Sequence, residues 1–528
     1  MRRIGIDVGG TNTDAVLISN EKVVHAVKRP TTSDVTSGIL DALALLRANN
    51  PLGAAPIDGV MIGTTHFMNA VVQRRQLTRV AALRLGMPAS SSLPPFCDWP
   101  RDLARLVEGG VWMVEGGHEY DGRAFMPLEE EAVRRAAREM KAKGLAAVAI
   151  SAMFSPLDPS HERRAAAIVA QENPGATITC SADLGRIGLL ERENAGLLNA
   201  ALCELARGTI AAFQAAIRDS AIDAPLFITQ NDGTVADTAQ ASRLPVYSFA
   251  SGATNSMRGG AYLCGVEEAM VVDVGGTTTD VGQLKNGFPR EANSVVKIAG
   301  VRTLFRMPDL VSIGLGGGSH VSLEPLRIGP LSVGYRLLRD GIAFGGSRLT
   351  ASDVAIAARL IALGDRARVA HLDAATCTRV LDEAKRMIEE SVDRMKTQSG
   401  EVQLIAVGGG AFLIPDRLEG VSRVIRVPHA DCANAVGAAI AQISGEVDRV
   451  FRDLTRGEAL ARAAALAADR AVAAGAERTT LKTVESEDIP IAYLPGNCLR
   501  VRVRVVGDVA QPPAPDGGPS QAGRPQPR

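Results

Sequence analysis

Two nearly identical peptides in this chain carry residue types that suit phosphate and metal binding. GIDVGGTNTD occupies residues 5–14, and VDVGGTTTD occupies residues 272–280. In both, an aspartate (Asp7 or Asp273) ends a short apolar run and is followed by Val-Gly-Gly-Thr. The copies stand about half of the 528 residues apart, far beyond the roughly 20–50-residue period of solenoid repeats. This spacing suits a duplicated domain.

An aspartate beside a Gly-Gly-Thr turn can hold a polyphosphate together with its cation. Glycines let the backbone turn tightly and bring N–H groups against an anion, and threonine adds a hydroxyl donor. A carboxylate would repel phosphate unless a cation intervened, so we expect Asp7 and Asp273 to be catalytic residues that bind Mg²⁺. A single copy could be only a hairpin turn whose aspartate bonds its own backbone. Two copies favour one nucleotide clamped from both sides.

A third glycine cluster, VGGG, follows a predicted strand at residues 407–410. The predicted nucleotide contacts in the three segments are Gly9, Gly10, Thr11 and Thr13, then Gly275, Gly276, Thr277 and Thr278, then Gly408, Gly409 and Gly410. Strand-forming residues follow the first two clusters, whereas dinucleotide-binding and Walker-type loops both lead directly into a helix. The pattern therefore predicts a strand–turn–strand hairpin at each copy.

The elements that must position these residues alternate between strands and helices. Helices are predicted over 35–49 and 190–220, and residues 86–127, rich in Gly, Pro and Trp, are expected to be irregular. Residues 402–418 are expected to form a strand, the glycines and a further helix. The small residues of 430–444 predict a helix suited to close packing.

Composition excludes several classes of protein. Hydrophobic residues make up 46% and basic and acidic residues are equal at 58 each, so we expect neither a nucleic-acid nor a membrane partner. No run of about 18 apolar residues predicts a membrane span, and the N-terminus does not resemble a signal peptide. The seven cysteines form no closely spaced pair, which favours reduced thiols and a cytoplasmic location.

These motifs resemble the actin-like ATPase superfamily and, more closely, the A-type, ATP-hydrolysing subunits of the hydantoinase/oxoprolinase family. Supporting stretches include IGTTHFMNAVVQRR, RENAGLLNAAL, TQNDGTVAD, GLGGGSHV and RIGPLSVG. The resemblance implies an α/β fold of two ribonuclease-H-like lobes with a nucleotide cleft between them, and it implies ATP and Mg²⁺ as cofactors. The expected division is an N-terminal lobe at 1–185, an A-type lobe at 186–450, a helical and strand extension at 451–505 and a disordered tail at 506–528.

The resemblance also implies an activity, the ATP-dependent opening of a cyclic amide such as hydantoin, N-methylhydantoin or 5-oxoproline. Phosphoryl transfer to a carbonyl oxygen would make a leaving group, and such transfer depends on positioning and charge neutralisation. It implies a B-type partner subunit and leaves a homodimer open. Two departures leave the substrate undecided: ASGATNSMRGG (250–260) replaces an SGPAGG-like turn, and RLLRDGIAFGG (336–346) replaces a PGPACYG-like stretch.

Further polar residues are candidates for substrate chemistry. His66 and Asn69 follow a predicted strand end, where a histidine could exchange protons near neutral pH; the alternative is a helix entry with local hydrogen bonds. His320 follows a glycine cluster. Asp353 could approach metal or substrate, or it could stabilise a helix that Thr350 caps.

Three other functions stay open. A ketone carboxylase subunit would use ATP but need bicarbonate and a different partner. A non-catalytic, nucleotide-binding regulatory protein would bind ATP without turnover stimulated by a small molecule. A sugar kinase is disfavoured because no clear carboxylate base in a sugar-binding loop is found.

Overall fold

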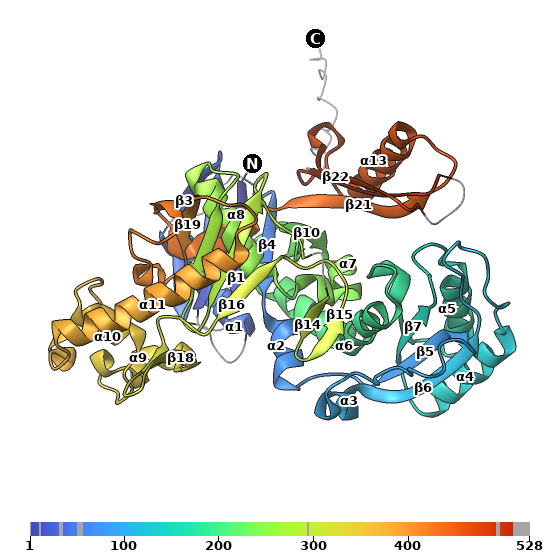
Figure 1. The fold of residues 1–528 in the computed structure, drawn as a ribbon, viewed down its shortest axis with the longest axis horizontal. Helices are drawn as coiled ribbons and strands as arrows, with labels where there is room; N and C mark the ends of the chain where they lie inside the picture. The colour runs from blue at the N-terminus through green and yellow to red at the C-terminus, as the bar shows by residue number, and fades with distance from the viewer. Residues whose placement is uncertain are drawn as a thin grey trace, which may run out of the picture.

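The computed structural model describes residues 2–9, 12–30, 35–49, 56–292, 295–492 and 497–510. It is an α/β protein in which two main sheets lie side by side and a third, smaller sheet lies at one end (Figure 1). The described residues confirm the expected α/β class.

The first main sheet is built around the N-terminal hairpin. Its order is β22-β23-β21-β10-β9-β4-β1-β2-β3. The relevant strands are β1 (Arg2–Val8), β2 (Asn12–Ser19), β3 (Lys22–Pro30), β4 (Gly59–Thr64), β9 (Leu226–Thr229) and β10 (Thr234–Asp237). β1 pairs antiparallel with β2 and parallel with β4. Helix α1 (Val35–Asn49), with the predicted bounds, joins β3 to β4.

The second main sheet repeats this arrangement. Its order is β13-β12-β11-β19-β20. These strands are β11 (Met270–Val274), β12 (Thr279–Lys285), β13 (Phe288–Pro289), β19 (Val402–Val407) and β20 (Val421–Ile425), and β16 (Leu310–Ile313) also pairs with β12. β11 pairs antiparallel with β12 and parallel with β19. Within each sheet the strand order 3-2-1-4-5 is that of a ribonuclease-H-like lobe, so the two expected lobes are present.

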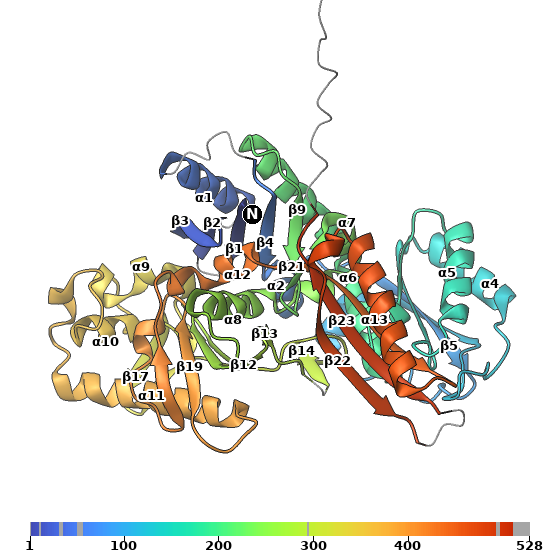
Figure 2. The ribbon, with the colours of Figure 1, turned by 90° about the horizontal axis from the view of Figure 1, so that it is seen from above.

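Two small-residue helices hold the lobes together, α8 (Ser251–Cys264) and α12 (Ala433–Ala439). A β-carbon on Gly259 would lie 1.8 Å from the Ala433 carbonyl oxygen, and one on Gly5 would lie 2.0 Å from the Ala435 carbonyl oxygen. Only glycine permits such close backbone approach. Figure 2 shows α8 and α12 between the sheets. The predicted helix over 430–444 is shorter than expected because Gln442 begins β21.

A third sheet and its helices are inserted between α2 (His66–Gln73) and α6 (Leu189–Asp219). Its parallel order is β6-β5-β7-β8, with β5 (Val80–Met87), β6 (Glu108–Glu115), β7 (Ala147–Ala152) and β8 (Thr177–Cys180). Helices α3 (Arg101–Val107), α4 (Glu130–Ala142) and α5 (Ser160–Glu172) accompany it. The prediction that 86–127 is irregular is wrong where α3 and β6 form. A β-carbon on Gly109 would lie 2.9 Å from the Val80 carbonyl oxygen, so glycine lets β6 pair closely.

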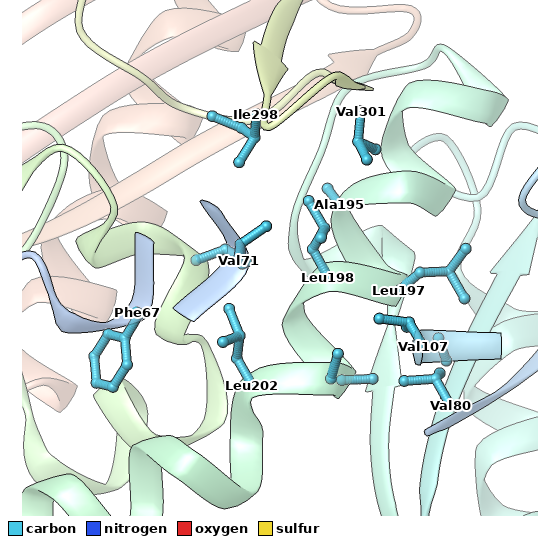
Figure 3. Close-up of a cluster of buried hydrophobic side chains, with 14 of the residues drawn as sticks. Phe67, Val71, Val80, Val107, Ala195, Leu197, Leu198, Leu202, Ile298 and Val301 are labelled. Carbon is cyan, nitrogen blue, oxygen red and sulfur yellow. The ribbon is translucent and has the colours of Figure 1, made fainter. Parts of the chain in front are cut away.

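Helix α6 is a core helix that joins two cores. Leu197 and Leu198 pack with Phe67 and Val301 (Figure 3), and Phe213 packs in the core of the first lobe. Within the described residues it is the one helix whose length and apolar composition could cross a membrane, and half of that apolar window is buried. Burial against two cores explains its composition.

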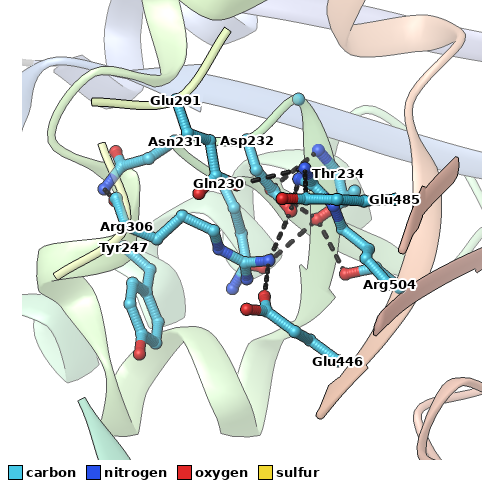
Figure 4. Close-up of polar contacts among 12 residues, drawn as sticks. Gln230, Asn231, Asp232, Thr234, Tyr247, Glu291, Arg306, Glu446, Glu485 and Arg504 are labelled. Atoms are coloured by element: carbon cyan, nitrogen blue, oxygen red, sulfur yellow. Dashed lines mark hydrogen bonds and ion pairs between the residues drawn. The ribbon is translucent and has the colours of Figure 1, made fainter. Parts of the chain in front are cut away.

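The remaining elements belong to the second lobe, to the C-terminal part of the first sheet and to the surroundings of α6, against which α7 and β15 pack. They are α7 (Thr238–Arg243), β14 (Val296–Ile298), β15 (Val301–Thr303), β17 (Ser319–Leu323), β18 (Leu326–Ser332), α9 (Leu337–Asp340), α10 (Ala351–Ala357), α11 (Ala374–Met395), β21 (Gln442–Phe451), α13 (Arg456–Ala473), β22 (Lys482–Pro490) and β23 (Leu499–Gly507). Buried ion pairs fasten β21–β23 to the lobes: Asp232 pairs with Arg306 and Arg504, and Glu446 with Arg306 (Figure 4).

The sheets do not follow the predicted domain boundaries. β9 and β10, placed by prediction in the second lobe, belong to the first sheet, as do β21–β23. The predicted 451–505 extension therefore completes the first sheet, because β22 and β23 pair with β21. β23 continues to Gly507, past the predicted start of the tail at residue 506. The rest of that tail, 511–528, lies outside the described residues.

Candidate functional site

The two glycine motifs form hairpins with the same register. In the first, Asp7 pairs with Asp14, and in the second, Asp273 pairs with Asp280. The turns close alike: Gly9 N–H donates to Asn12 O at 3.0 Å, and Gly275 N–H donates to Thr278 O at 2.9 Å. The predicted strand–turn–strand form is thus present twice. Gly10 and Thr11 lie outside the described residues.

Asp7 is a buried carboxylate at the end of β1, only 3% exposed. Asn434 Nδ2, from α12, donates to its Oδ2 at 2.7 Å. Among the described residues Asp7 Oδ1 has no hydrogen-bond partner. Burial above all, together with the charges of Asp14 and Asp273, raises the pKa of Asp7 to about 7. Because Asp7 senses Asp273, carboxylates from both hairpins lie close to one another.

Asp14 carries the cation nearest to this group. Lys28 Nζ lies 2.7 Å from Asp14 Oδ1 and also donates to the Asp431 carbonyl oxygen at 2.9 Å. Burial raises the pKa of Asp14 to about 6, although Lys28 opposes the shift. The first hairpin thus has two carboxylates and one lysine.

Asp273 is half-buried at the end of β11. Burial raises its pKa to about 6, a hydrogen bond from Ser256 lowers it, and Asp280 raises it. The pKa of Asp280 is raised by burial as well, with Ser312 hydrogen-bonded to it. Such raised pKa values mark a place where a cation would stabilise the ionised carboxylates.

The second turn is held by the glycine cluster of GLGGGS. Gly317 N–H donates to Gly275 O at 3.0 Å, and Gly318 N–H donates to Gly276 O at 2.7 Å. Thr277 is half-buried and Thr278 is exposed, so this turn presents hydroxyl groups to the outside. Thr13 is also predicted to contact the nucleotide. Its side chain is instead fully buried below the first turn.

The third glycine cluster lies against the second hairpin. Gly408 has φ +89°, and a β-carbon there would lie 2.2 Å from Asp273 Oδ1. Gly410 N–H donates to Val274 O at 2.7 Å, while a β-carbon on Gly409 would meet nothing within 4 Å. The glycines thus let this loop touch the base of the hairpin.

The predicted helix after these glycines is wrong. Only a 3-10 turn, Ala411–Leu413, forms, because Pro415 follows closely and disfavours the helical conformation of its predecessor. A pocket of about 660 Å³ opens beside the turn, lined among others by Gly408, Phe412, Ile414 and Asp431. Its apolar walls next to the glycines suit a flat, partly apolar group such as a nucleobase.

His66 and Asn69 lie at the neighbouring strand end. β4 ends at Thr64, which pairs with Val8 of β1, and α2 starts at His66. His66 N–H donates to Thr64 Oγ1 at 3.1 Å, and Asn69 Nδ2 donates to Thr65 Oγ1 at 3.2 Å. Burial lowers the pKa of His66. The pair lies near the first hairpin and makes local bonds, so its role toward substrate stays a prediction.

Asp353 is a structural residue, and the prediction that it approaches metal or substrate is wrong. It is fully buried and forms a capping box with Thr350 at the start of α10. Its carboxylate also accepts the backbone N–H groups of Ile342 and Ala343. These bonds use both oxygens of the carboxylate. The side chain of Thr350 accepts the backbone N–H of Asp353, which confirms Thr350 as the N-cap. His320 faces Thr350 across an isolated β-bridge.

Comparison with known families decides the relationship. Residues 3–173 match the Hydantoinase/oxoprolinase N-terminal region, and residues 192–365 match Hydantoinase/oxoprolinase. The chain belongs to the hydantoinase/oxoprolinase family.

Two of the curated relatives that the chain matches are named as enzyme subunits. The caprolactamase subunit alpha of Pseudomonas jessenii is 27% identical over 69% of this chain and 55% of its own length. The acetophenone carboxylase gamma subunit of Aromatoleum aromaticum is 27% identical over 66% of this chain and 52% of its own length. The chain thus spans about half the length of the curated relatives it matches.

Solved structures of family members share the fold. The crystal structure of ATP-dependent caprolactamase from Pseudomonas jessenii matches 97% of this chain and 88% of its own, with a TM-score of 0.77 and 21% identity. Nucleotide-free acetone carboxylase matches 97% of this chain and 89% of its own, with a TM-score of 0.66 and 18% identity. At such identities the likeness is one of fold.

The carboxylates fit a cation that is shared with a ligand. The described residues contain no group of three or more His, Cys, Asp or Glu side chains arranged around a metal position. Mg²⁺ usually takes one or two protein carboxylates, with phosphate oxygens and water as its other ligands. The unpartnered Asp7 Oδ1 and the raised pKa of Asp273 fit that kind of site.

Sequence reasoning missed three polar neighbours of the carboxylates: Lys28, Ser256 and Asn434. Asn434 is 427 residues from Asp7 in sequence. No local pattern marks such a pair, since only the packing of α12 against β1 brings them together.

Proposed function

We propose that the chain binds Mg·ATP between its two hairpins and uses phosphoryl transfer to open a cyclic amide. The observation that carries this proposal is the pair of hairpins with matching register, in which the charge of Asp273 on the second hairpin raises the pKa of Asp7 on the first. In this arrangement the turns at 9–12 and 275–278 would hold the phosphates, and the pocket beside Gly408 would take the adenosine.

Each group of this chain has a task in that reaction. Asp7 and Asp273 would hold Mg²⁺, which supplies neutralisation of the charge on the transferred phosphoryl group. Asn434 fixes Asp7, and Ser256 fixes Asp273. His66 would sit by the substrate, where its lowered pKa keeps the ring neutral near pH 7 and able to accept a proton. Transfer of the γ-phosphoryl group to the amide oxygen would release ADP and make the ring carbon electrophilic. Water would add to that carbon, the C–N bond would break as the ring nitrogen takes up a proton, and hydrolysis of the remaining acyl phosphate would release phosphate and the ring-opened acid.

The substrate class we favour is a lactam, hydantoin or 5-oxoproline-type ring. Support comes from the caprolactamase relative, whose alpha subunit aligns with this chain. Because that relative is named as a subunit, we also propose a B-type partner subunit for the hydrolytic half of the reaction. We place the enzyme in the cytoplasm.

A second candidate is the ATP-using subunit of a ketone carboxylase. The acetophenone carboxylase gamma subunit is 27% identical to this chain, the same value as the caprolactamase subunit. Identity alone therefore does not separate the two substrates.

The test is phosphate release from Mg·ATP by the purified chain, alone and with a co-expressed B-type subunit. Caprolactam, hydantoin, N-methylhydantoin, 5-oxoproline and acetophenone with bicarbonate would be added in turn. We expect one cyclic amide to stimulate release and to give a ring-opened product. Stimulation only by ketone with bicarbonate would move the protein to the carboxylases, and nucleotide binding without any stimulation would favour the regulatory alternative.

A further inference from the structure

Two consecutive polar residues of α8, Asn255 and Ser256, reach both nucleotide hairpins. They belong to the segment 250–260 that departs from the SGPAGG-like turn of the family. Asn255 is fully buried and Ser256 is 1% exposed. Ser256 hydrogen-bonds Asp273, which leaves open what Asn255 does.

The side chain of Asn255 lies beside Asp7. A β-carbon on Gly63 would lie 2.6 Å from Asn255 Nδ2 and 2.7 Å from Asp7 Oδ1, so both side chains border the same glycine. Asn255 Nδ2 donates to Thr229 Oγ1 at 3.0 Å. This bond at the end of β9 fixes the amide plane.

Each of these two side chains has one buried acceptor that lacks a donor. Among the described residues, Asn255 Oδ1 and Asp7 Oδ1 both have no hydrogen-bond partner. Burying an acceptor without a donor costs about 1–3 kcal/mol, so a water that supplies the missing donor stabilises such an atom. Asn434 already occupies the other oxygen of Asp7, which leaves Oδ1 as its free ligand atom.

The backbone around Asn255 is held rigidly. A β-carbon on Gly437 of α12 would lie 1.8 Å from the Asn255 carbonyl oxygen, so the two helices touch at this residue. The same α12 carries Asn434, which bonds Asp7. Asn255, Asp7 and Asn434 therefore form one preorganised unit.

We propose that Asn255 Oδ1 and Asp7 Oδ1 together accept hydrogen bonds from a water molecule in the hydration shell of the nucleotide-bound divalent cation. A metal-bound water has two hydrogens to donate and no acceptor to offer, which matches two acceptors without donors. Asn255 is thus a positioning residue for the cation, and α8 supports both carboxylates, Asp7 through this water and Asp273 through Ser256. The inference rests on the nucleotide site proposed above.

The test measures cation binding without turnover. Mn²⁺ would be titrated into the full chain in the presence of ADP, and free Mn²⁺ would be followed by electron paramagnetic resonance. Loss of an outer-shell partner weakens metal affinity about 10- to 100-fold, so we expect that loss in Asn255→Ala. Asn255→Asp keeps an acceptor and adds charge, and it should bind Mn²⁺ at least as tightly as the wild type.

Asn199→Ala is the matched control. Asn199 is also fully buried in a helix, and its Oδ1 also lacks a partner among the described residues, but it bonds Thr179 on the inserted sheet. We expect this variant to keep wild-type Mn²⁺ affinity.

The outcomes separate the inference from the function on which it rests. Wild-type Mn²⁺ affinity in Asn255→Ala, whatever its melting temperature, would overturn the inference and leave the nucleotide site standing. If Asn255→Ala does not fold, weaker binding by a folded Asn255→Asp would overturn it equally. Absence of Mn²⁺ binding by the wild type with ADP would overturn both proposals.

Discussion

The two hairpins have the same strand register but different surroundings. In the first, Asp7 and Asp14 are each 3% exposed and contact Asn434 and Lys28. In the second, Asp273 and Asp280 are half-buried and hydrogen-bond serines. Among the described residues no lysine or arginine forms an ion pair with either carboxylate of the second hairpin.

The difference shows which features the two copies of the peptide share and which they do not. The register that brings an aspartate to each turn is kept, whereas the supporting contacts have changed. The first hairpin holds its carboxylates in a buried, partly neutralised group, and the second presents an exposed turn backed by glycines 316–318. We infer that both hairpins serve the proposed cation and phosphates, and that the first holds its aspartates in place through more side-chain contacts than the second.

The largest expected effect comes from neutralising either aspartate. Asp7→Asn and Asp273→Asn should each lower ATP turnover at least about 100-fold, because charge neutralisation by a metal contributes several kcal/mol and 1.36 kcal/mol is tenfold in rate. Phosphate release measures this, with circular dichroism as a check on folding. Asp237→Asn is the control, since Asp237 is an N-cap that asparagine can replace. Wild-type turnover in a folded Asp273→Asn variant would contradict the proposal that both hairpins hold the nucleotide and its cation.

Glycines beside the two aspartates should differ in sensitivity. Gly408→Ala places a β-carbon 2.2 Å from Asp273 Oδ1 at φ +89°, and it should cost about 2–4 kcal/mol of unfolding free energy. Gly63→Ala meets side-chain ends only, Asn255 Nδ2 and Asp7 Oδ1, and needs no positive φ, so it should cost less, about 1 kcal/mol. Urea unfolding measures both. Gly208→Ala, where nothing lies within 4 Å, should be slightly stabilising in its helix; a larger loss for Gly63→Ala than for Gly408→Ala would reverse the ranking.

Lysine 28 should matter to the first hairpin alone. Lys28→Met leaves Asp14 buried without its partner and should cost about 2 kcal/mol, reduced because the Lys28 side chain is 30% exposed. Adding Asp14→Asn should recover most of that loss. Asp280→Asn, in the hairpin that has serines, should change stability by less than about 0.5 kcal/mol. Chemical unfolding of the wild type and these three variants checks this, and an unaffected Lys28→Met would show that the ion pair contributes nothing to stability.

The smallest expected effect is a pH dependence from Asp7. Its pKa in the folded protein is about 7, above the value of about 3.9 for an unfolded chain. The folded state therefore holds a proton that the unfolded state lacks, and this contribution to stability is lost as pH rises toward 7. Without metal, wild-type stability relative to Asp7→Asn should fall by about 1 kcal/mol between pH 6 and pH 7.5. Parallel curves for the two proteins would contradict the raised pKa.

Local patterns in the sequence predict much of the fold. Both hairpins, α1 and the capping residue Thr350 follow from apolar runs and turn or cap residues. The predictions that are wrong concern features that depend on tertiary packing. The strand β6 is obscured by glycines that close packing requires. β9 and β10 join a sheet whose previous strand along the chain, β4, ends about 160 residues before β9 begins.

In the candidate site, too, local sequence patterns do not reveal the residues that tertiary packing brings together. Asp7 and Asp273 could be predicted because the motif repeats. Their neighbourhood also includes Asn434, Lys28 and Asn255, which are brought there only by helix and sheet packing. Asp353 shows the opposite case, since an acid in a segment that resembles the family proves to be the partner of the N-cap Thr350 in a capping box.

The most direct test of the central claim is nucleotide binding by isothermal titration calorimetry, with a non-hydrolysable ATP analogue and Mg²⁺. If one site lies between the two hairpins, we expect one nucleotide per chain and an affinity at least about tenfold weaker in Asp7→Asn and in Asp273→Asn alike. Two nucleotides per chain, or unchanged affinity in either folded variant, would contradict a single site clamped from both sides.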